Sequence, residues 1–293
     1  HELGHQWWGD LVTCSSFHHI WLNEGFARFC EAIWDEASQG FEAYKSYWQS
    51  HSYFGPGTIY VEEPNTAAQI FNGNLTYNKA GWVVHMLRGV MGDSLFFESL
   101  RSYGYNDSLA YSDATTEDFK NVCEHISGID LTNFFEQWIY NEYYPQYGLL
   151  WNFNELDELI ITVHQLQNWQ YFDMPIEIKV ILTSGALSFK INNQYQMEQY
   201  NLGQVNSIPL DVQLDPDGWI LKEVQYLNND KITPELSNII AYPAYPNPFN
   251  PKINFQYFLP LNYGEIDPTI QIYDLQGKVM EKISLDRSKP GFN

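Results

Sequence analysis

The chain has 293 residues, of which 44% are hydrophobic and 17% aromatic, enough to fill more than one hydrophobic core. Its 15 Lys and Arg residues are outnumbered by 36 Asp and Glu residues, which gives a formal net charge of −21. An acidic surface repels nucleic acids and anionic membranes, so we expect neither as a partner. No apolar run approaches the roughly 20 residues that cross a bilayer, so we expect no transmembrane segment.

The first part of the chain, residues 1–147, has the sequence pattern of α-helices. Apolar residues recur at intervals of three and four over residues 22–37, and similar patterns cover residues 81–90, 116–124 and 131–140. Pro145 and Gly148 then disfavour further helix, which predicts a boundary near residue 147. The three cysteines, Cys14, Cys30 and Cys123, show no C-x-x-C spacing, so one disulfide and free thiols both remain open.

The rest of the chain has the pattern of β-strands. Short runs rich in Ile, Val and aromatic residues occupy residues 159–163, 176–180 and 187–191, with turn residues between them. We therefore predict a small β-sandwich over residues 148–227. Residues 228–245 are predicted to form a linker, and residues 246–293 a last β domain with strands at 253–258 and 270–273 and a turn at 276–277.

The chemistry of the chain begins with the sequence His1-Glu2-Leu3-Gly4-His5, which fits the pattern H-E-x-x-H. Residues four apart share one face of a helix, so both imidazoles can reach one metal ion. Imidazole nitrogens suit zinc, which in enzymes takes about four ligands and keeps one position for water. Glu2 could then accept a proton from that water. A chance match is the alternative for a motif this short.

A second motif strengthens the prediction of a metal site. Glu24 lies in the sequence WLNEGFA, at the start of a predicted amphipathic helix, where its carboxylate can fold back as a third ligand. Glu31 follows seven residues later on the same stripe and could orient a ligand histidine, although a solvated surface carboxylate is an equal alternative. Asp10 is a weaker candidate for the same role.

These motifs resemble those of the aminopeptidase N type of gluzincin metallopeptidases. The matching sequences are HELGHQWWGDLVT, WLNEGFA, TYNKAGWVVHMLR and FFEQWIYNEYYPQYG, followed by MPIEIK and LDPDGWIL. The resemblance covers roughly residues 1–226. It implies a mainly α-helical, thermolysin-like catalytic half followed by a small β-sandwich, so that the whole chain would be a multidomain α+β protein.

The resemblance also implies roles for individual residues. It makes His1, His5 and Glu24 the ligands of one zinc ion per chain, and Glu2 the general base. It makes Tyr77 the phenol that stabilises the tetrahedral oxyanion, a role that suits a neutral O–H group. The other histidines have no ligand-like spacing to these residues and are predicted to be structural.

Two departures from the family pattern affect this interpretation. The sequence around Tyr77 is Tyr-Asn-Lys-Ala-Gly, whereas the family more often has Tyr-Glu-Lys-Gly. The family's Gly-x-Met-Glu-Asn segment, whose glutamate holds the free amino group of the substrate, lies upstream of HExxH and is not in this sequence. Removal of residues from the amino end of peptides is therefore implied by the resemblance alone.

The end of the chain resembles the C-terminal sorting domain of proteins exported by the type IX secretion system. The resemblance is carried by AYPNPFNP, followed by INFQYFLP and IQIYDLQGKVM. It implies a truncated Ig-like β domain that contacts the secretion machinery, and a protein secreted from or attached to the surface of a Gram-negative bacterium. A Pro-rich linker to a plain β module is the alternative.

Three functions are compatible with the sequence. The first is a zinc aminopeptidase that acts on peptide substrates. The second is a thermolysin-like endopeptidase, which shares HExxH but which the WLNEG sequence disfavours. The third is a non-catalytic surface-binding protein on a peptidase fold, which the intact set of His1, Glu2, His5, Glu24 and Tyr77 disfavours.

Overall fold

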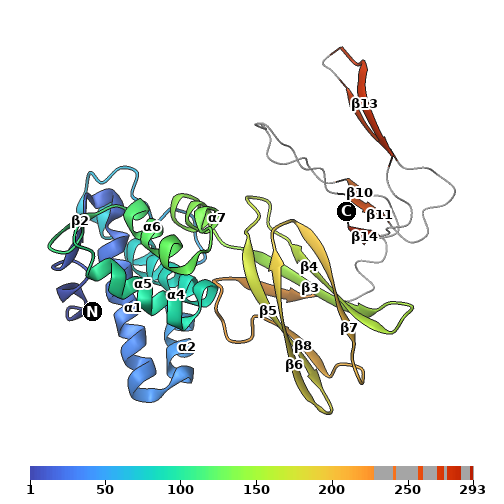
Figure 1. Cartoon of the computed structure of the whole chain (residues 1–293), viewed down its shortest axis with the longest axis horizontal. Coiled ribbons are helices and arrows are strands. Elements are labelled where there is room, and N and C mark those ends of the chain that lie inside the picture. Colours follow the sequence, from blue (N-terminus) through green and yellow to red (C-terminus); the bar gives the residue numbers. More distant parts are fainter. Residues whose placement is uncertain (228–239, 242–256, 260–268, 274–275, 285–290, 293) are drawn as a thin grey trace. The chain divides into compact units, whose positions relative to one another are not determined.

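The computed structural model of the chain describes residues 1–227, 240–241, 257–259, 269–273, 276–284 and 291–292. The chain divides into two compact units. Helices and several sheets together make a mixed α+β fold, as the sequence predicts (Figure 1). The domain boundaries at residues 147 and 227 stay a prediction. The first unit comprises His1–Tyr147, Gln165–Gln196 and Asn206–Val224, and the second Gly148–His164, Met197–Val205 and Gln225–Asn293.

The helices of the first unit confirm the predicted helical pattern. The predicted helices at residues 22–37, 81–90 and 116–124 lie within α1, α4 and α6, and the one at 131–140 corresponds to α7 and a following π-helix. The helices are α1 (Trp21–Gln39), α2 (Phe41–Ser50), α3 (Ala67–Ile70), α4 (Ala80–Met91), α5 (Asp93–Gly104), α6 (Thr116–Ser127) and α7 (Thr132–Phe135), with 3₁₀-helices at Gly4–Gln6 and Phe17–His19 and π-helices at Gly73–Lys79 and Glu136–Tyr140.

A short parallel strand pair also belongs to the helical part, and the sequence pattern did not predict it. Strand β1 (Val12–Cys14) pairs with β2 (Ser112–Ala114) in parallel. Strands of three residues are too short to show the alternation of apolar and polar residues by which strands are predicted. The pair ties the segment after HExxH to the residues that precede α6.

The core of the helical part is built around the buried face of α1. Phe26 is fully buried, and its ring centroid lies 5.0 Å from those of Trp8 and Phe119 and 6.0 Å from that of Trp21. Such stacked, tilted and edge-to-face ring pairs add to the stabilisation from burial. Because Trp8 follows HExxH and Trp21 precedes Glu24, this core fixes both motifs against the same helix.

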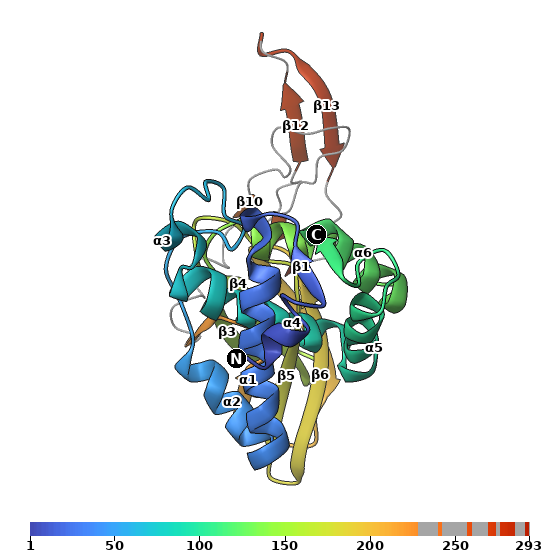
Figure 2. The same cartoon turned by 90° about the vertical axis from the view of Figure 1, so that its left-hand side faces the viewer.

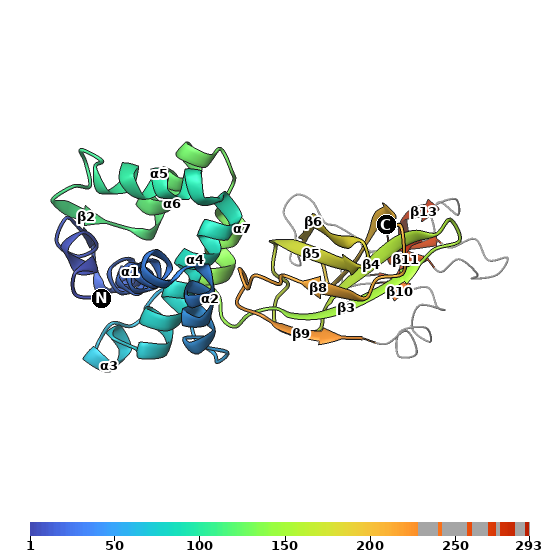
Figure 3. The same cartoon turned by 90° about the horizontal axis from the view of Figure 1, so that it is seen from below.

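Helices α1 and α4 approach each other at two glycines, and Figures 2 and 3 both show them side by side. A Cβ atom on Gly25 would lie only 2.8 Å from the Cβ of Ala80. A Cβ on Gly81 would lie 2.9 Å from the Cβ of Arg28. Larger residues at these two positions would force the helices apart. Because Glu24 directly precedes Gly25, this contact also brings Glu24 close to the π-helix Gly73–Lys79, which leads into α4.

The region 146–227 contains two sheets. The predicted runs at residues 159–163, 176–180 and 187–191 lie in β4 (Glu158–Gln165), β5 (Met174–Leu182) and β6 (Gly185–Asn193), which confirms them. Strand β5 alternates buried and half-buried residues along its whole length, as a strand with one covered face does. The face-to-face packing of a β-sandwich stays a prediction. One sheet has the order β6, β5, β8 (Asp211–Leu214), and the other the order β7 (Met197–Gln204), β4, β3 (Gln146–Phe153), β9 (Glu223–Tyr226). The pairs β4–β7, β5–β6 and β5–β8 are antiparallel.

Most of the described residues of the tail form strands. Strands β12 (Thr269–Tyr273) and β13 (Val279–Ser284) pair antiparallel, which confirms the predicted strand at 270–273. Strands β10 (Ile240–Ala241), β11 (Tyr257–Leu259) and β14 (Gly291–Phe292) form a second sheet.

Two predictions for the tail fall mostly outside the described residues. These are the strand at 253–258 and the linker at 228–245, whose Ile240–Ala241 belongs to β10 instead. The Ig-like architecture stays a prediction. Among the described residues, no helix has the length and apolarity that a membrane span needs.

Candidate metal centre

The HExxH sequence forms a short helical turn rather than the longer helix that the motif predicts. The turn continues into the 3₁₀-helix Gly4–Gln6, and the carbonyl of His1 accepts backbone hydrogen bonds from Gly4 at 2.7 Å and from His5 at 3.4 Å. Gly4 packs against α1, where a Cβ would lie 3.2 Å from the Cα of Ala27. The turn still places the two imidazoles together, because the Nε2 atoms of His1 and His5 are 3.2 Å apart.

Glu24 completes a group of three ligand atoms. Its Oε2 atom lies 3.3 Å from the Nε2 of His1 and 3.3 Å from the Nε2 of His5. Glu24 is only 7% exposed. The structure therefore brings together the three residues that the sequence predicts as metal ligands, in the only such group of His, Cys, Asp and Glu found among the described residues.

The opposite ring nitrogens of the two histidines face acceptor groups. The Nδ1 of His1 lies 2.7 Å from Oε1 of Glu31, and the Nδ1 of His5 lies 3.0 Å from the carbonyl oxygen of Trp8. A carboxylate and a carbonyl can only accept, so both Nδ1 atoms carry the proton in this network. Each Nε2 atom then presents a lone pair toward the centre of the group.

The group fits a zinc ion. Two imidazole lone pairs and a carboxylate oxygen at 3.2–3.3 Å repel one another unless a cation lies among them. Neutral histidine nitrogens and a carboxylate oxygen are ligands that zinc binds, at about 2.0–2.2 Å. A tetrahedron with bonds of about 2.0–2.1 Å has edges of about 3.3–3.4 Å, close to the observed separations. Three protein ligands also leave one position for water or substrate, as catalytic zinc sites do.

Glu31 is held by more than His1. Its Oε2 atom accepts hydrogen bonds from the hydroxyl of Tyr47 at 2.7 Å and from Nη1 of Arg28 at 3.0 Å. The contact of Glu31 with His1 is the one that the sequence predicts from its position on α1. Asp10, the weaker candidate, has an exposed side chain, and its backbone N–H donates to the carbonyl of His5 at 2.9 Å.

Tyr77 lies beside the group formed by His1, His5 and Glu24. Its ring stacks on the imidazole of His1 with centroids 5.7 Å apart and planes at 18°. Burial raises the pKa of Tyr77 to about 12, and the carboxylates of Glu24 and Glu2 add to the rise. The hydroxyl therefore keeps its proton at neutral pH and is available as a hydrogen-bond donor.

Glu2 has an exposed side chain next to the same group. Its charge reaches Glu24, because burial raises the pKa of the Glu24 carboxyl and the negative charge of Glu2 raises it further, while His5 and Tyr77 lower it. The structure thus brings all five predicted site residues together: three converge on one point, and Glu2 and Tyr77 lie beside them.

Sequence reasoning missed three groups around the site. The carbonyl of Trp8 could not be predicted, because a backbone acceptor leaves no signal in the residue type. Arg28 and Tyr47 carry no motif, although Arg28 lies three residues before Glu31 on the same helix and can face it. Tyr47 lies on α2, and only the fold brings it to Glu31.

The residue pattern recurs in known proteins. Residues 1–138 match the model of the peptidase family M1 domain. Residues 243–291 match that of the secretion system C-terminal sorting domain.

Residues 1–138 are therefore similar to a peptidase family M1 domain.

Curated relatives of the M1 domain are aminopeptidases. Aminopeptidase M1-D of Oryza sativa subsp. japonica is 33% identical over 51% of this chain and 18% of its own length. Aminopeptidase N of Lactococcus lactis subsp. lactis is 29% identical over 50% of this chain and 18% of its own length. The matches span less than a fifth of these relatives.

Two further comparisons extend beyond the M1 domain. Tricorn protease-interacting factor F2 of Thermoplasma acidophilum is 26% identical over 71% of this chain and 28% of its own length. The crystal structure of Legionella pneumophila aminopeptidase A in complex with aspartic acid superposes with a TM-score of 0.69 at 16% identity. It covers 80% of this chain and 27% of that chain, so this aminopeptidase-like fold extends past residue 138. The family and these relatives support a metallopeptidase, and zinc is implied by the family.

His85 is one of the histidines that the sequence predicts to be structural, and it lies in the core. His85 is buried, its Nε2 donates to the carbonyl of Gly218 at 3.0 Å, and its Nδ1 accepts from the hydroxyl of Tyr44 at 2.7 Å. Burial lowers the pKa of His85 to about 3, so the ring is neutral. Of the two possibilities for the cysteines, the structure has free thiols at Cys14, Cys30 and Cys123.

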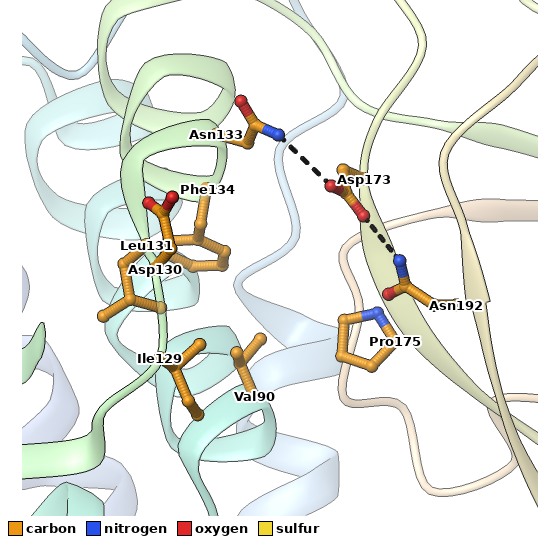
Figure 4. A pocket seen from close by; sticks show the side chains of 9 residues that line it. All are labelled: Val90, Ile129, Asp130, Leu131, Asn133, Phe134, Asp173, Pro175 and Asn192. Carbon is orange, nitrogen blue, oxygen red and sulfur yellow. Dashed lines mark hydrogen bonds between the residues drawn. The ribbon is translucent and has the colours of Figure 1, made fainter.

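A cavity of about 440 Å³ lies between the end of α4, α7 and strands β5 and β6 of the first unit (Figure 4). Asp173 accepts hydrogen bonds from the amides of Asn133 at 3.3 Å and Asn192 at 2.9 Å. Both carboxylate oxygens are therefore partnered within the protein, and the bonds join α7 to the β6 strand. None of the lining residues belongs to the metal centre.

Proposed function

We propose that this chain contains the zinc site of an aminopeptidase, which removes residues from the amino end of peptides. The observation that carries the proposal is the convergence of His1, His5 and Glu24, with ligand atoms 3.2–3.3 Å apart. These three residues would hold one zinc ion per chain. The match of residues 1–138 to the M1 domain supports the same assignment.

Each residue of the site has a distinct part in the proposed reaction. Zinc supplies Lewis acidity, which polarises the scissile carbonyl and lowers the pKa of water. Glu2 accepts a proton from the attacking water and passes it to the leaving amine. Tyr77 donates its O–H to the oxyanion that develops on the carbonyl oxygen. Glu31 and the Trp8 carbonyl keep the two histidines in the tautomer whose Nε2 lone pair faces the centre.

The ligand assignment is tested by metal analysis of the full-length protein. We expect about one zinc per chain in the wild type and the loss of most of it in Glu24→Ala, because three protein ligands are usual for a catalytic zinc. Glu42→Ala is the matched control, since Glu42 is an exposed glutamate on α2 and makes only a surface ion pair with Lys45. Equal zinc in all three proteins would remove Glu24 from the ligand set.

The aminopeptidase activity is tested with a pair of peptides that differ only in their amino terminus. An aminopeptidase cleaves the peptide with a free amino group and spares the same peptide after N-acetylation. Cleavage of both at internal bonds would instead support a thermolysin-like endopeptidase. A protein that binds zinc but cleaves neither would support a binding function on a peptidase fold.

We further propose that residues 246–293 form an Ig-like sorting domain recognised by the type IX secretion machinery, with residues 228–245 as the linker. The match of residues 243–291 to the sorting-domain model supports this role. The protein would then be secreted from, or attached to the surface of, a Gram-negative bacterium. Fusion of these residues to a periplasmic reporter in a bacterium with this system tests the proposal, because export should require them.

A further inference from the structure

The carboxylate of Glu31 is the meeting point of three hydrogen-bond donors. The Nδ1 of His1 is 2.7 Å from Oε1, and the hydroxyl of Tyr47 is 2.7 Å from Oε2. Nη1 of Arg28 reaches both oxygens, at 3.3 Å and 3.0 Å. One oxygen thus faces the metal ligand, and the other faces a tyrosine from a different helix.

The tyrosine is itself held firmly in place. Its ring stacks on the imidazole of His51 with centroids 4.2 Å apart, and meets the Trp48 ring edge to face at 5.2 Å. Trp48 is almost completely buried at 1% exposure, which fixes this part of α2 in the core. The hydroxyl of Tyr47 is therefore presented to Glu31 from a rigid support.

Glu31 needs such support. Its side chain is 23% exposed, so water can compete for its oxygens, and a glutamate has several rotamers. A rotamer change would break the contact with His1, whose ring could then turn its Nε2 away from the centre of the ligand group. Groups that hold a ligand histidine typically change metal affinity 10–100-fold when they are removed.

We propose that Tyr47 is a positioning residue of the metal centre, which fixes the Glu31 carboxylate and, through it, the orientation of the His1 imidazole. This inference rests on the proposed zinc site. Arg28 also donates hydrogen bonds to Glu31, but its positive charge repels a nearby cation. Replacing Arg28 would therefore lower zinc affinity through the lost hydrogen bonds and raise it through the lost charge. Tyr47→Phe changes no charge and is the variant that isolates positioning.

The test measures zinc affinity of the full-length protein by competition with a chelator. We expect Tyr47→Phe to bind zinc about tenfold more weakly than the wild type. Tyr44→Phe is the matched control: Tyr44 lies on the same helix and its hydroxyl also bonds a histidine at 2.7 Å, but that histidine is His85 in the core. Its removal should lower the melting temperature and leave the zinc affinity unchanged.

A double-mutant cycle shows whether Tyr47 acts through Glu31. In the Glu31→Gln background, Tyr47→Phe should weaken zinc binding by much less than tenfold, because its partner is already changed. Wild-type zinc affinity in Tyr47→Phe, or an equal loss with and without the Glu31 carboxylate, would overturn the inference. A wild-type protein that binds no zinc would instead refute the proposed function itself.

Discussion

Two glutamates of the site have different environments and should give different mutants. Glu24 is buried and its Oε2 faces both histidine Nε2 atoms, whereas Glu2 is exposed beside them. Glu2→Gln has almost the same shape and should keep the zinc. Turnover should nevertheless fall by about 10²–10⁴, the usual contribution of a general base. Zinc content and kcat of the full-length variant check this, and full turnover with zinc bound would contradict the assignment.

Tyr77 should act mainly in the transition state. Its phenol keeps its proton, with a pKa of about 12, and its ring stacks on His1. In Tyr77→Phe the hydrogen bond to the developing oxyanion is lost, so kcat should fall by about 10²–10³ while KM changes little. Steady-state kinetics at saturating zinc measure both. A variant that raises KM and leaves kcat unchanged would place Tyr77 in substrate binding instead.

At the scale of residues, the sequence predicts side-chain positions where spacing alone fixes them. His1 and His5 converge because one helical turn separates them, and Glu24 and Glu31 share a face of α1 because seven residues are nearly two turns. Tyr77 could be singled out among 21 tyrosines only through its motif. The Trp8 carbonyl and Tyr47 depend on how the chain folds back on itself, which no spacing records.

At the scale of elements, the helix that carries Tyr77 also contains a buried lysine. Lys79 is 1% exposed, and its ammonium donates to the carbonyl of Gly57 at 3.1 Å. Burial lowers the pKa of Lys79 to about 8, against an ordinary value of 10.5. Below about pH 8 Lys79 is protonated in both the folded and the unfolded chain. Its buried charge then lowers the free energy of unfolding by about 3 kcal/mol.

The buried charge of Lys79 predicts that the free energy of unfolding depends on pH. Between about pH 8 and pH 10.5 the unfolded chain keeps the proton that the folded chain releases, so the contribution of Lys79 to the free energy of unfolding rises with pH. Relative to Lys79→Met, the wild type should therefore gain stability from about pH 7 to pH 10. Denaturant unfolding of both proteins at these two pH values measures the change. A difference that is constant with pH would show that the folded lysine titrates normally.

The elements that the sequence predicted well are those long enough to show a period. The helix at residues 22–37 and the strand at 176–180 repeat their apolar residues several times. Strands β1 and β2 have three residues each, and the π-helix Gly73–Lys79 has only seven. Their geometry comes from contacts with distant parts of the chain, so the local sequence could not specify it.

At the scale of the whole molecule, the M1 match and the sorting-domain match occupy separate stretches of sequence. All five predicted site residues lie within the first 77 residues. Removal of residues 241–293 should therefore change kcat by less than about twofold, because a linker transmits little geometry. The same deletion should abolish export. Turnover of both purified proteins and their amounts in the medium check this, and a large loss of turnover in a folded variant would give the tail a second role.

The glycine contacts between α1 and α4 limit how such a site can diversify. At Gly25 and Gly81 no space remains for a side chain, so these positions cannot drift without moving Glu24 or the Tyr77 segment. Selection for a new substrate would have to leave the contact between α1 and α4 unchanged. It would act instead on residues around the proposed metal centre. A mutant library that spares the two glycines should consequently contain far more zinc-binding members than one that randomises them.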